Sequence, residues 1–151
     1  MALTLAPRPN PATWLWLLSA LFLARVLGQM AVAFAGVTWL PPMPEWYSGL
    51  LPYPVLLPTQ WLILSLMLHL NRQATRQQGW ATVLRPRLGR GLLAFAALYA
   101  GGMVVRYVVS GELHPERRWW PPGSIPIVFH LVLARYLAVV ASVCRQPLEA
   151  R

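Results

Sequence analysis

Four long apolar stretches constrain this chain more than any other feature of its sequence. They cover residues 14–40, 51–70, 91–109 and 125–144. A helix rises about 1.5 Å per residue, so each stretch is long enough to cross a hydrocarbon layer of about 30 Å. Only 11% of the residues are charged, whereas about 25% is usual for soluble domains. The sequence therefore predicts an all-α integral membrane protein, with four transmembrane helices in a compact bundle that forms a single domain over residues 1–151.

The basic residues indicate how these four spans are oriented. Arginines are favoured in cytoplasmic loops, and residues 71–90, between the second and third spans, contain five arginines and no acid. This connection is therefore expected inside, which puts the N and C termini in the cytoplasm as well. Residues 41–50 and 110–124 become the outer loops. We expect a multi-pass protein of the cytoplasmic (inner) membrane of a bacterium.

Prolines and small residues give two further expectations about the helices. Pro52, Pro54 and Pro58 stand at the start of the second span, and proline lacks a backbone donor, so we expect an irregular, kinked or partly re-entrant beginning. Small residues let helices approach closely in lipid, so we expect the first and third spans to pack together, unless these residues only reflect an alanine-rich composition. They are Ala20, Ala24 and Gly28 in the first span and Ala97 and Gly101 in the third.

Two arginines, Arg25 and Arg135, lie near the middle of the first and fourth spans. Insertion scales assign each about 2.5 to 3.5 kcal/mol, so both are expected to face the bundle interior, a wet cavity or a partner. Gln29, one turn after Arg25, and Gln60, near mid-depth in the second span, add amide groups to this polar centre. No acid lies inside any predicted span. The guanidinium groups therefore need backbone carbonyls, water, a loop glutamate, another subunit's acid or an anionic ligand.

Two interpretations of the polar centre follow. In the first it is a cationic pocket, open toward the outer leaflet, that receives a carboxylate, a phosphate or a lipid head group. Its walls are then Arg25, Gln29, Gln60, Arg106, His130 and Arg135, and its outer lid is Glu45, Trp46, Tyr47, His114, Trp119 and Trp120. In the second, Arg106 reaches the outer interface, Arg25 and Arg135 bond to helix ends and kinked backbone and bind no ligand, and the loop aromatics only anchor the chain among head groups.

Several other classes of function find no support in the sequence. The net charge of +9 comes from arginines scattered between apolar spans, so no nucleic-acid interface is predicted. Cys144 is the only cysteine, which excludes an internal disulfide and a thiolate metal cage. His69 and His130 fall at opposite ends of their spans, about 20 Å apart along the membrane normal at 1.5 Å per residue, so a haem between them is not expected. No spacing selects a reaction, and we predict no catalytic residue, metal site or cofactor.

The segment LARVLGQMAVAFAG, residues 23–36, and the four-span layout together resemble DoxX-like small membrane proteins, in which an arginine and spaced glycines mark the first helix. The resemblance covers less than a tenth of the chain and implies only a similar architecture. From the residues themselves we expect a small accessory or structural protein of the lipid bilayer, packed with itself or with a larger complex that supplies the missing acid. The alternative is a lipid-modifying enzyme or transporter that binds an anionic, amphipathic small molecule.

Overall fold

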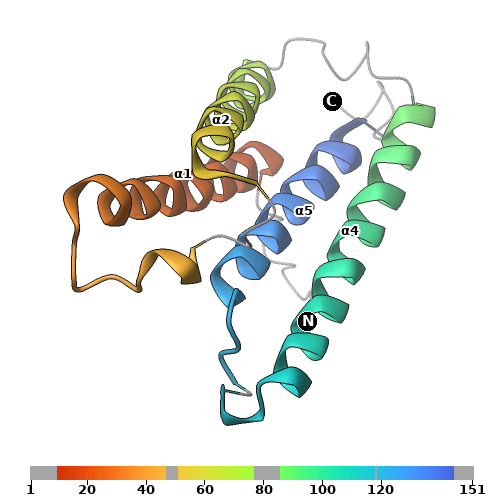
Figure 1. Cartoon of the computed structure of the whole chain (residues 1–151). Coiled ribbons are helices and arrows are strands. Elements are labelled where there is room, and N and C mark those ends of the chain that lie inside the picture. The colour runs from red at the N-terminus through yellow and green to blue at the C-terminus, as the bar shows by residue number, and fades with distance from the viewer. Residues whose placement is uncertain (1–9, 47–50, 77–85, 118, 145–151) are drawn as a thin grey trace, which may run out of the picture.

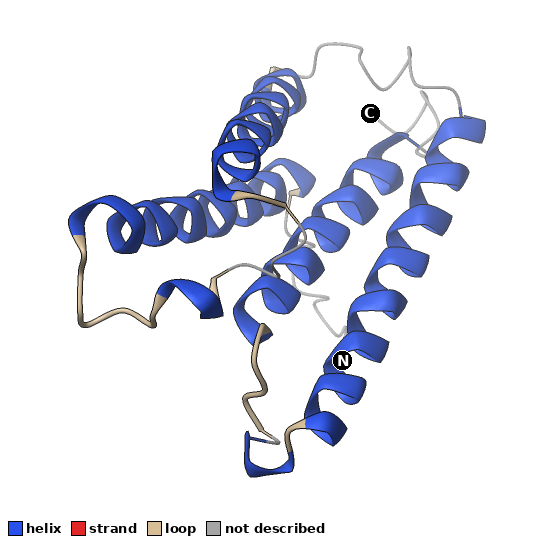
Figure 2. Cartoon of the chain, in the orientation of Figure 1, coloured by secondary structure: helices blue, strands red, loops and turns tan. Residues whose placement is uncertain are grey.

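The computed structural model describes residues 10–46, 51–76, 86–117 and 119–144, and within these ranges every regular element is a helix (Figure 1, Figure 2). Each of the four long helices is long and apolar enough to cross a membrane. The prediction of an all-α chain with four candidate spans is therefore confirmed. The long helices are α1 (Pro11–Ala35), α2 (Tyr53–Thr75), α4 (Pro86–Leu113) and α5 (Ser124–Cys144), and two short 3-10 helices are η1 (Met43–Glu45) and η2 (Pro115–Arg117).

The ends of α1 follow from the chemistry of its flanking residues. The helix begins after Asn10, whose side-chain oxygen accepts a 3.0 Å hydrogen bond from Ala12 N, and a proline fills the first helical position, where no N–H donor is needed. It ends before Gly36, which adopts a left-handed φ of 60°. The helix therefore stops short of the predicted end at Leu40.

Leu51 and Pro52 precede the helix, but from Tyr53 on α2 is helical, so the expected irregular or re-entrant course is wrong for Pro54 and Pro58. Pro54 stands in the first turn, where a helix has no acceptor for the backbone N–H, and it therefore costs no hydrogen bond. Pro58 lies inside the helix and removes a single rung of the ladder. At its other end α2 continues to Thr75, beyond the predicted end at Leu70.

The four long helices form two antiparallel pairs, α1 with α2 and α4 with α5, and the pairs meet where α1 packs against α5 (Figure 1). The core lies at this meeting point and includes Leu15, Leu18, Phe22, Met67, Tyr136 and Val139. By contrast, only 6% of the apolar window of α4 is buried. The expected close packing of the first and third spans is wrong, because α4 lies along α5 and makes at most marginal contact with α1.

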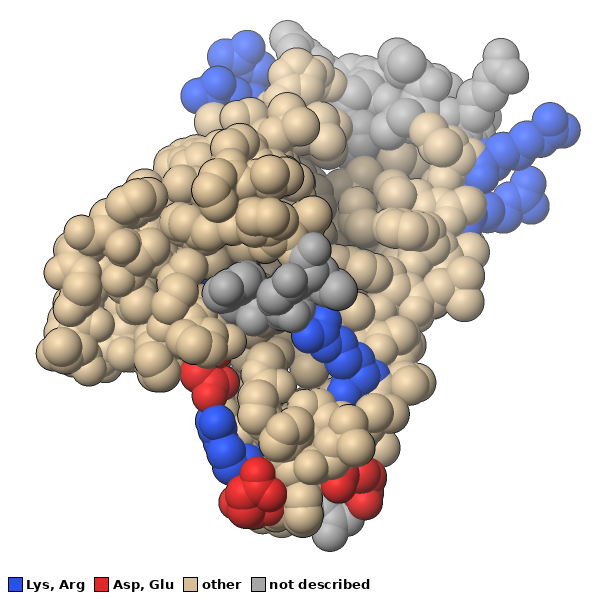
Figure 3. All heavy atoms as spheres, viewed as in Figure 1, with Lys and Arg blue, Asp and Glu red and all other residues tan. Residues whose placement is uncertain are grey.

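Charged residues are unevenly distributed over the molecule (Figure 3). In that view basic residues lie at the upper ends of α2 and α4, the acids lie in the lower part, and further basic residues lie in the middle and beside the acids. The lower part also holds an ion pair of 2.8 Å between Arg117 and Glu45. The basic upper end carries Arg72 and Arg76 at the close of α2 and Arg87 and Arg90 in the first turns of α4.

A buried asparagine, Asn71, ties three helices together. Its Nδ2 donates to Ser19 Oγ at 2.8 Å and to the Leu15 carbonyl oxygen at 3.4 Å, both in α1. Its Oδ1 accepts from the hydroxyl of Tyr136 in α5 at 3.0 Å, and the same hydroxyl lies 3.2 Å from the Met67 carbonyl oxygen. Because Asn71 is fully buried, these bonds are costly to break, and they fix the register of α1, α2 and α5. We call this set of contacts the Asn71 clamp.

Replacing Asn71 by leucine is expected to lower the free energy of unfolding by about 1 to 2 kcal/mol, because the hydroxyls of Ser19 and Tyr136 lose their buried partner. Denaturant unfolding in mild detergent, followed by circular dichroism, measures the change. Gln73→Leu is the matched control on the same helix, since Gln73 bonds His69 one turn away at the exposed surface. It should cost less than about 0.5 kcal/mol. Equal losses in the two variants would contradict the clamp.

Candidate functional site

Arg25 is the charged group at the centre of the site. Helical spacing puts it on the same face of α1 as the core residues Phe22 and Val26, and only 5% of its surface is exposed. Its Nη2 donates a 2.8 Å hydrogen bond to the carbonyl oxygen of Trp46, while its Nε has no hydrogen-bond partner. Within the described ranges no carboxylate pairs with it. The guanidinium is therefore anchored in place but not neutralised.

Trp46 holds the carbonyl group that anchors Arg25. This tryptophan is buried, and its Nε1 donates to the Pro41 carbonyl oxygen at 2.8 Å. Its ring lies on Gly28, where an added Cβ would come within 2.7 Å of the ring atom Cη2. The missing side chain at Gly28 therefore makes room for the Trp46 ring and not for another helix. Trp46, predicted as part of a lid, instead positions the buried cation.

Gln29 and Gln60 form an amide pair between α1 and α2. Gln60 Nε2 donates to Gln29 Oε1 at 3.0 Å, and both side chains are buried. The remaining polar atoms, Gln29 Nε2 and Gln60 Oε1, have no partner. If both amides were reversed, the pair would again leave one donor and one acceptor free. In either arrangement the pair offers hydrogen bonds that the surrounding residues do not take up.

A cavity of about 190 Å³ opens beside Arg25 and Gln60. Tyr99 and His130 complete its polar wall with Thr59, so all four long helices contribute. The His130 Nδ1 faces the carbonyl oxygen of Pro126 in its own helix, which leaves Nε2 as the ring nitrogen available to a ligand. The apolar wall consists of Phe22, Leu51, Leu56, Ile63, Phe129 and Leu133. We call this space the Arg25 cavity.

The Arg25 cavity brings together most of the residues predicted for the pocket. Arg25, Gln60 and His130 line it, and Gln29 is bonded to Gln60. Arg106 does not line it. The Arg106 guanidinium lies instead at the connection from α4 to α5, where its Nη2 would be 3.7 Å from a Cβ placed on Gly123.

Arg135 lies on a different face of the molecule from the Arg25 cavity. Its side chain is exposed, and its guanidinium carbon lies 5.9 Å from the centroid of the Trp14 ring. The next residue, Tyr136, takes the core position and turns Arg135 outward, because successive helical residues are about 100° apart. Of the surroundings expected for Arg135, the bundle interior is excluded, and a wet cavity or a partner stays a prediction.

The residues predicted as an outer lid do not form one cover over the Arg25 cavity. Glu45 pairs with Arg117 and not with a buried arginine. Tyr47 lies outside the described residues. Three other predicted lid residues do not line the cavity: His114, Trp119 and Trp120.

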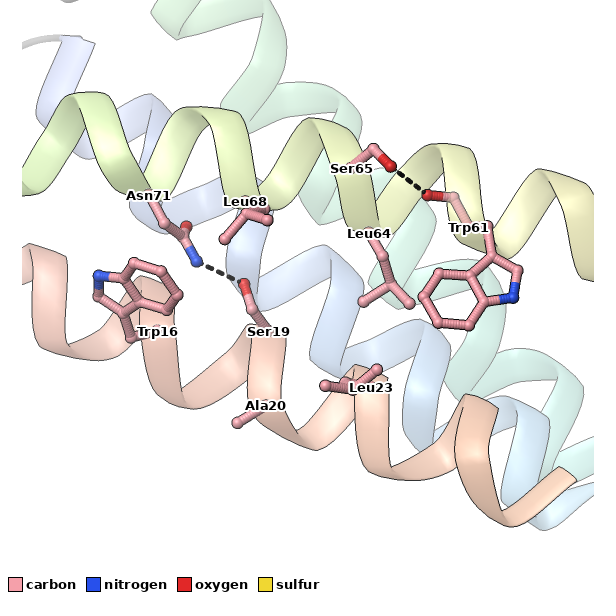
Figure 4. Close-up of a pocket in the computed structure, with 9 residues that line it drawn as sticks. All are labelled: Trp16, Ser19, Ala20, Leu23, Trp61, Leu64, Ser65, Leu68 and Asn71. Carbon is pink, nitrogen blue, oxygen red and sulfur yellow. Dashed lines mark hydrogen bonds between the residues drawn. The ribbon is translucent and has the colours of Figure 1, made fainter. Parts of the chain in front are cut away.

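A second hollow, of about 270 Å³, lies between α1 and α2 (Figure 4). Trp16 and Trp61 stand near its two ends, and leucine side chains lie between them. Two of its polar contacts are already made, Asn71 with Ser19 and the Ser65 hydroxyl with the Trp61 carbonyl oxygen, each at 2.8 Å. The hollow is therefore a mainly apolar groove, in contrast to the Arg25 cavity, whose wall contains a buried cation.

Comparison of the chain with protein-family models, with curated proteins and with solved structures gives no match. The part of the chain that the structure describes contains no group of three or more His, Cys, Asp or Glu side chains placed to hold a metal ion. The four apolar helices define the class as a small, candidate multi-pass membrane protein. The groups in the described part of this chain that can bind a ligand or a partner are the buried cation, the amide pair and the exposed arginine.

Gly28→Ala is expected to lower the free energy of unfolding by about 1 to 3 kcal/mol, because the added methyl group overlaps the Trp46 ring. Gly101→Ala in α4 is the matched control: no atom lies within 4 Å of the position of its added Cβ. That change should be neutral or stabilise the helix by up to about 1 kcal/mol. Denaturant titration of both variants in the same detergent measures the difference. If Gly28→Ala is as stable as Gly101→Ala, the ring does not pack on Gly28.

Proposed function

We propose that the chain is an accessory subunit of a membrane complex, in which the α4–α5 side packs against a transmembrane helix of another protein that carries an acidic residue. One observation carries the proposal. Arg135 lies near the middle of α5 with its side chain exposed, and among the described residues its guanidinium lies over the Trp14 ring.

The α4–α5 side has a shallow groove of about 260 Å³ around this arginine. Five of its eight lining residues are alanines, which would let the backbone of another helix come close. Little of the apolar surface of α4 is buried within the chain, so this surface is free for lipid or for a partner. The lining residues are Leu93, Ala96, Ala97, Ala100, Leu131, Ala134, Arg135 and Ala138.

The charge of Arg135 points to an acidic partner. Its contact with the Trp14 ring is a cation–π interaction, which leaves the charge in place. An arginine at the centre of a bilayer costs about 2.5 to 3.5 kcal/mol by insertion scales. A carboxylate at the same depth would remove much of that cost, because it supplies opposite charge and two acceptors for the guanidinium.

A second copy of this chain does not offer such a carboxylate. The sequence contains no aspartate and four glutamates; three of these lie in the described residues, none of the three near the middle of a long helix, and Glu149 lies outside the described residues. They are Glu45, Glu112, Glu116 and Glu149. The proposal therefore commits to a different protein with an aspartate or glutamate inside its own transmembrane helix.

The charge at the two ends supports an orientation for this complex. The arginines that close α2 and open α4 lie together at one end (Figure 3). Since such residues are favoured on the cytoplasmic side, this end and both termini are proposed to lie in the cytoplasm, with the protein in the inner membrane of a bacterium.

Changing Arg135 to leucine is expected to release the partner. Native mass spectrometry of the wild-type chain, purified in mild detergent, should show a complex of fixed stoichiometry. The variant should retain less than about a tenth of it, as expected for loss of a charge-assisted contact in a low-dielectric setting. Changing the partner's intramembrane acid to its amide should give the same loss.

Arg90→Leu is the matched control for this experiment, since Arg90 is an exposed arginine near the start of α4 and outside the groove. It should leave the complex intact. Recovery of the wild-type chain as a monomer alone, or equal loss of complex in both variants, would contradict the proposal.

A further inference from the structure

We propose that the Arg25 cavity binds the oxyanion head of an amphipathic molecule, a phosphate or a carboxylate on an apolar chain, through Arg25 and Gln60. This inference goes beyond the accessory role and does not depend on it. The cavity lies among α1, α2, α4 and α5, whereas the proposed partner covers the groove around Arg135.

The buried charge of Arg25 is the first reason. Its one hydrogen bond goes to a neutral carbonyl group, and its Nε has no partner although the residue is only 5% exposed. A buried cation is stable only when an opposite charge or a full set of acceptors compensates for its lost hydration. The described part of the chain provides one carbonyl group and no paired carboxylate. An oxyanion in the adjoining cavity would supply both the charge and the acceptors, and a guanidinium group suits it well.

The amide pair provides a second contact. Gln60 lines the cavity, and its side chain has one atom without a partner. Because Gln60 and Gln29 can reverse together and keep their mutual hydrogen bond, Gln60 is able to turn its NH₂ group toward an anion. Two donors on different helices, the Arg25 guanidinium in α1 and the Gln60 amide in α2, would then hold the same head group.

The walls and size of the cavity define the rest of the ligand. Apolar side chains make up about half of the lining, so a charged group alone would leave these walls without a partner. A cavity of about 150 Å³ is large enough to hold benzene, and this one measures about 190 Å³. The cavity therefore has room for a head group and the first few carbons of the ligand's apolar chain. The rest of that apolar chain would extend out of the cavity.

His130 favours a phosphate over a carboxylate. Its Nδ1 faces a backbone carbonyl oxygen, which can only accept, so in the neutral tautomer that satisfies this contact Nε2 is an acceptor. A singly protonated phosphate ester has both the oxyanion that Arg25 requires and a hydroxyl group that can donate to this nitrogen. An ionised carboxylate has acceptors only.

The test uses the full chain in an uncharged detergent, stripped of bound lipid and titrated by native mass spectrometry. The probes are decyl phosphate, decanoate, inorganic phosphate, decanol and a short-chain phosphatidic acid. We expect one decyl phosphate per chain, bound at least about tenfold more tightly than decanol or inorganic phosphate, with decanoate in between. Tighter binding of phosphatidic acid than of decyl phosphate would identify a lipid as the source, and the reverse a single-chain metabolite. Binding of decanol or inorganic phosphate as tight as that of decyl phosphate would overturn the proposal.

Two variants locate the ligand. Arg25→Gln removes the charge but keeps a donor for the Trp46 carbonyl group, and it should weaken decyl phosphate binding at least about tenfold. Gln60→Met does not touch the Trp46 anchor and should weaken binding severalfold, which keeps the test valid if the first variant is poorly folded. Unchanged affinity in Gln60→Met and in a folded Arg25→Gln would overturn the site.

Arg135→Gln is the matched control, because it removes a second arginine near the middle of a long helix that lies outside the cavity. It should leave decyl phosphate binding unchanged. An equal loss in Arg25→Gln and Arg135→Gln would mean nonspecific attraction to positive charge and would overturn the proposal. Because the accessory role is tested by the loss of a protein partner, the two proposals fail on different measurements.

Discussion

The hydrogen bonds of Asn71 connect α1, α2 and α5, the three helices that form the core. In lipid, apolar surfaces gain little by meeting one another, so helix pairs depend on close packing and on polar contacts. Asn71 reaches both α1 and α5 from α2 and has partners for its donor and its acceptor. The core therefore has three helices around one polar contact, and α4 is attached to it mainly through α5. Because α4 contacts the core mainly through α5, most of its length faces outward.

The two buried polar clusters of this protein differ in how completely their atoms are hydrogen-bonded. The Asn71 clamp is fully paired, as expected of a contact that sets helix register. The centre formed by Arg25, Gln29 and Gln60 is only partly paired, with three atoms that lack partners. Both join α1 to α2, so the same helix pair carries a fully paired and a partly paired polar contact. Incomplete pairing next to a cavity indicates binding more strongly than the presence of polar residues alone.

Hydropathy was sufficient to predict the four helices, and depth along each span was sufficient to group Arg25 with Gln29 and Gln60. Which way Arg135 faces could not be predicted, because α5 is apolar nearly all the way round and its sequence marks no single buried face. Asn71 was missed because it follows the last apolar residue of its span and begins an arginine-rich segment. The spacing of small residues wrongly predicted that the first and third spans pack together. Gly28 instead contacts a tryptophan from a loop, and such a contact has no periodic signal in the sequence.

The unequal lengths of α4 and α5 have a consequence for where such a protein can reside. α4 has 28 residues and α5 has 21, so at 1.5 Å per residue they measure about 42 Å and 32 Å. The shorter helix matches a hydrocarbon layer of about 30 Å, while its antiparallel neighbour exceeds it. In a bilayer of that thickness α4 would have to tilt, or extend its charged first turns among the head groups. Thin and thick bilayers would then hold the molecule at different angles, and membrane thickness itself would influence which face of α4 meets its neighbours.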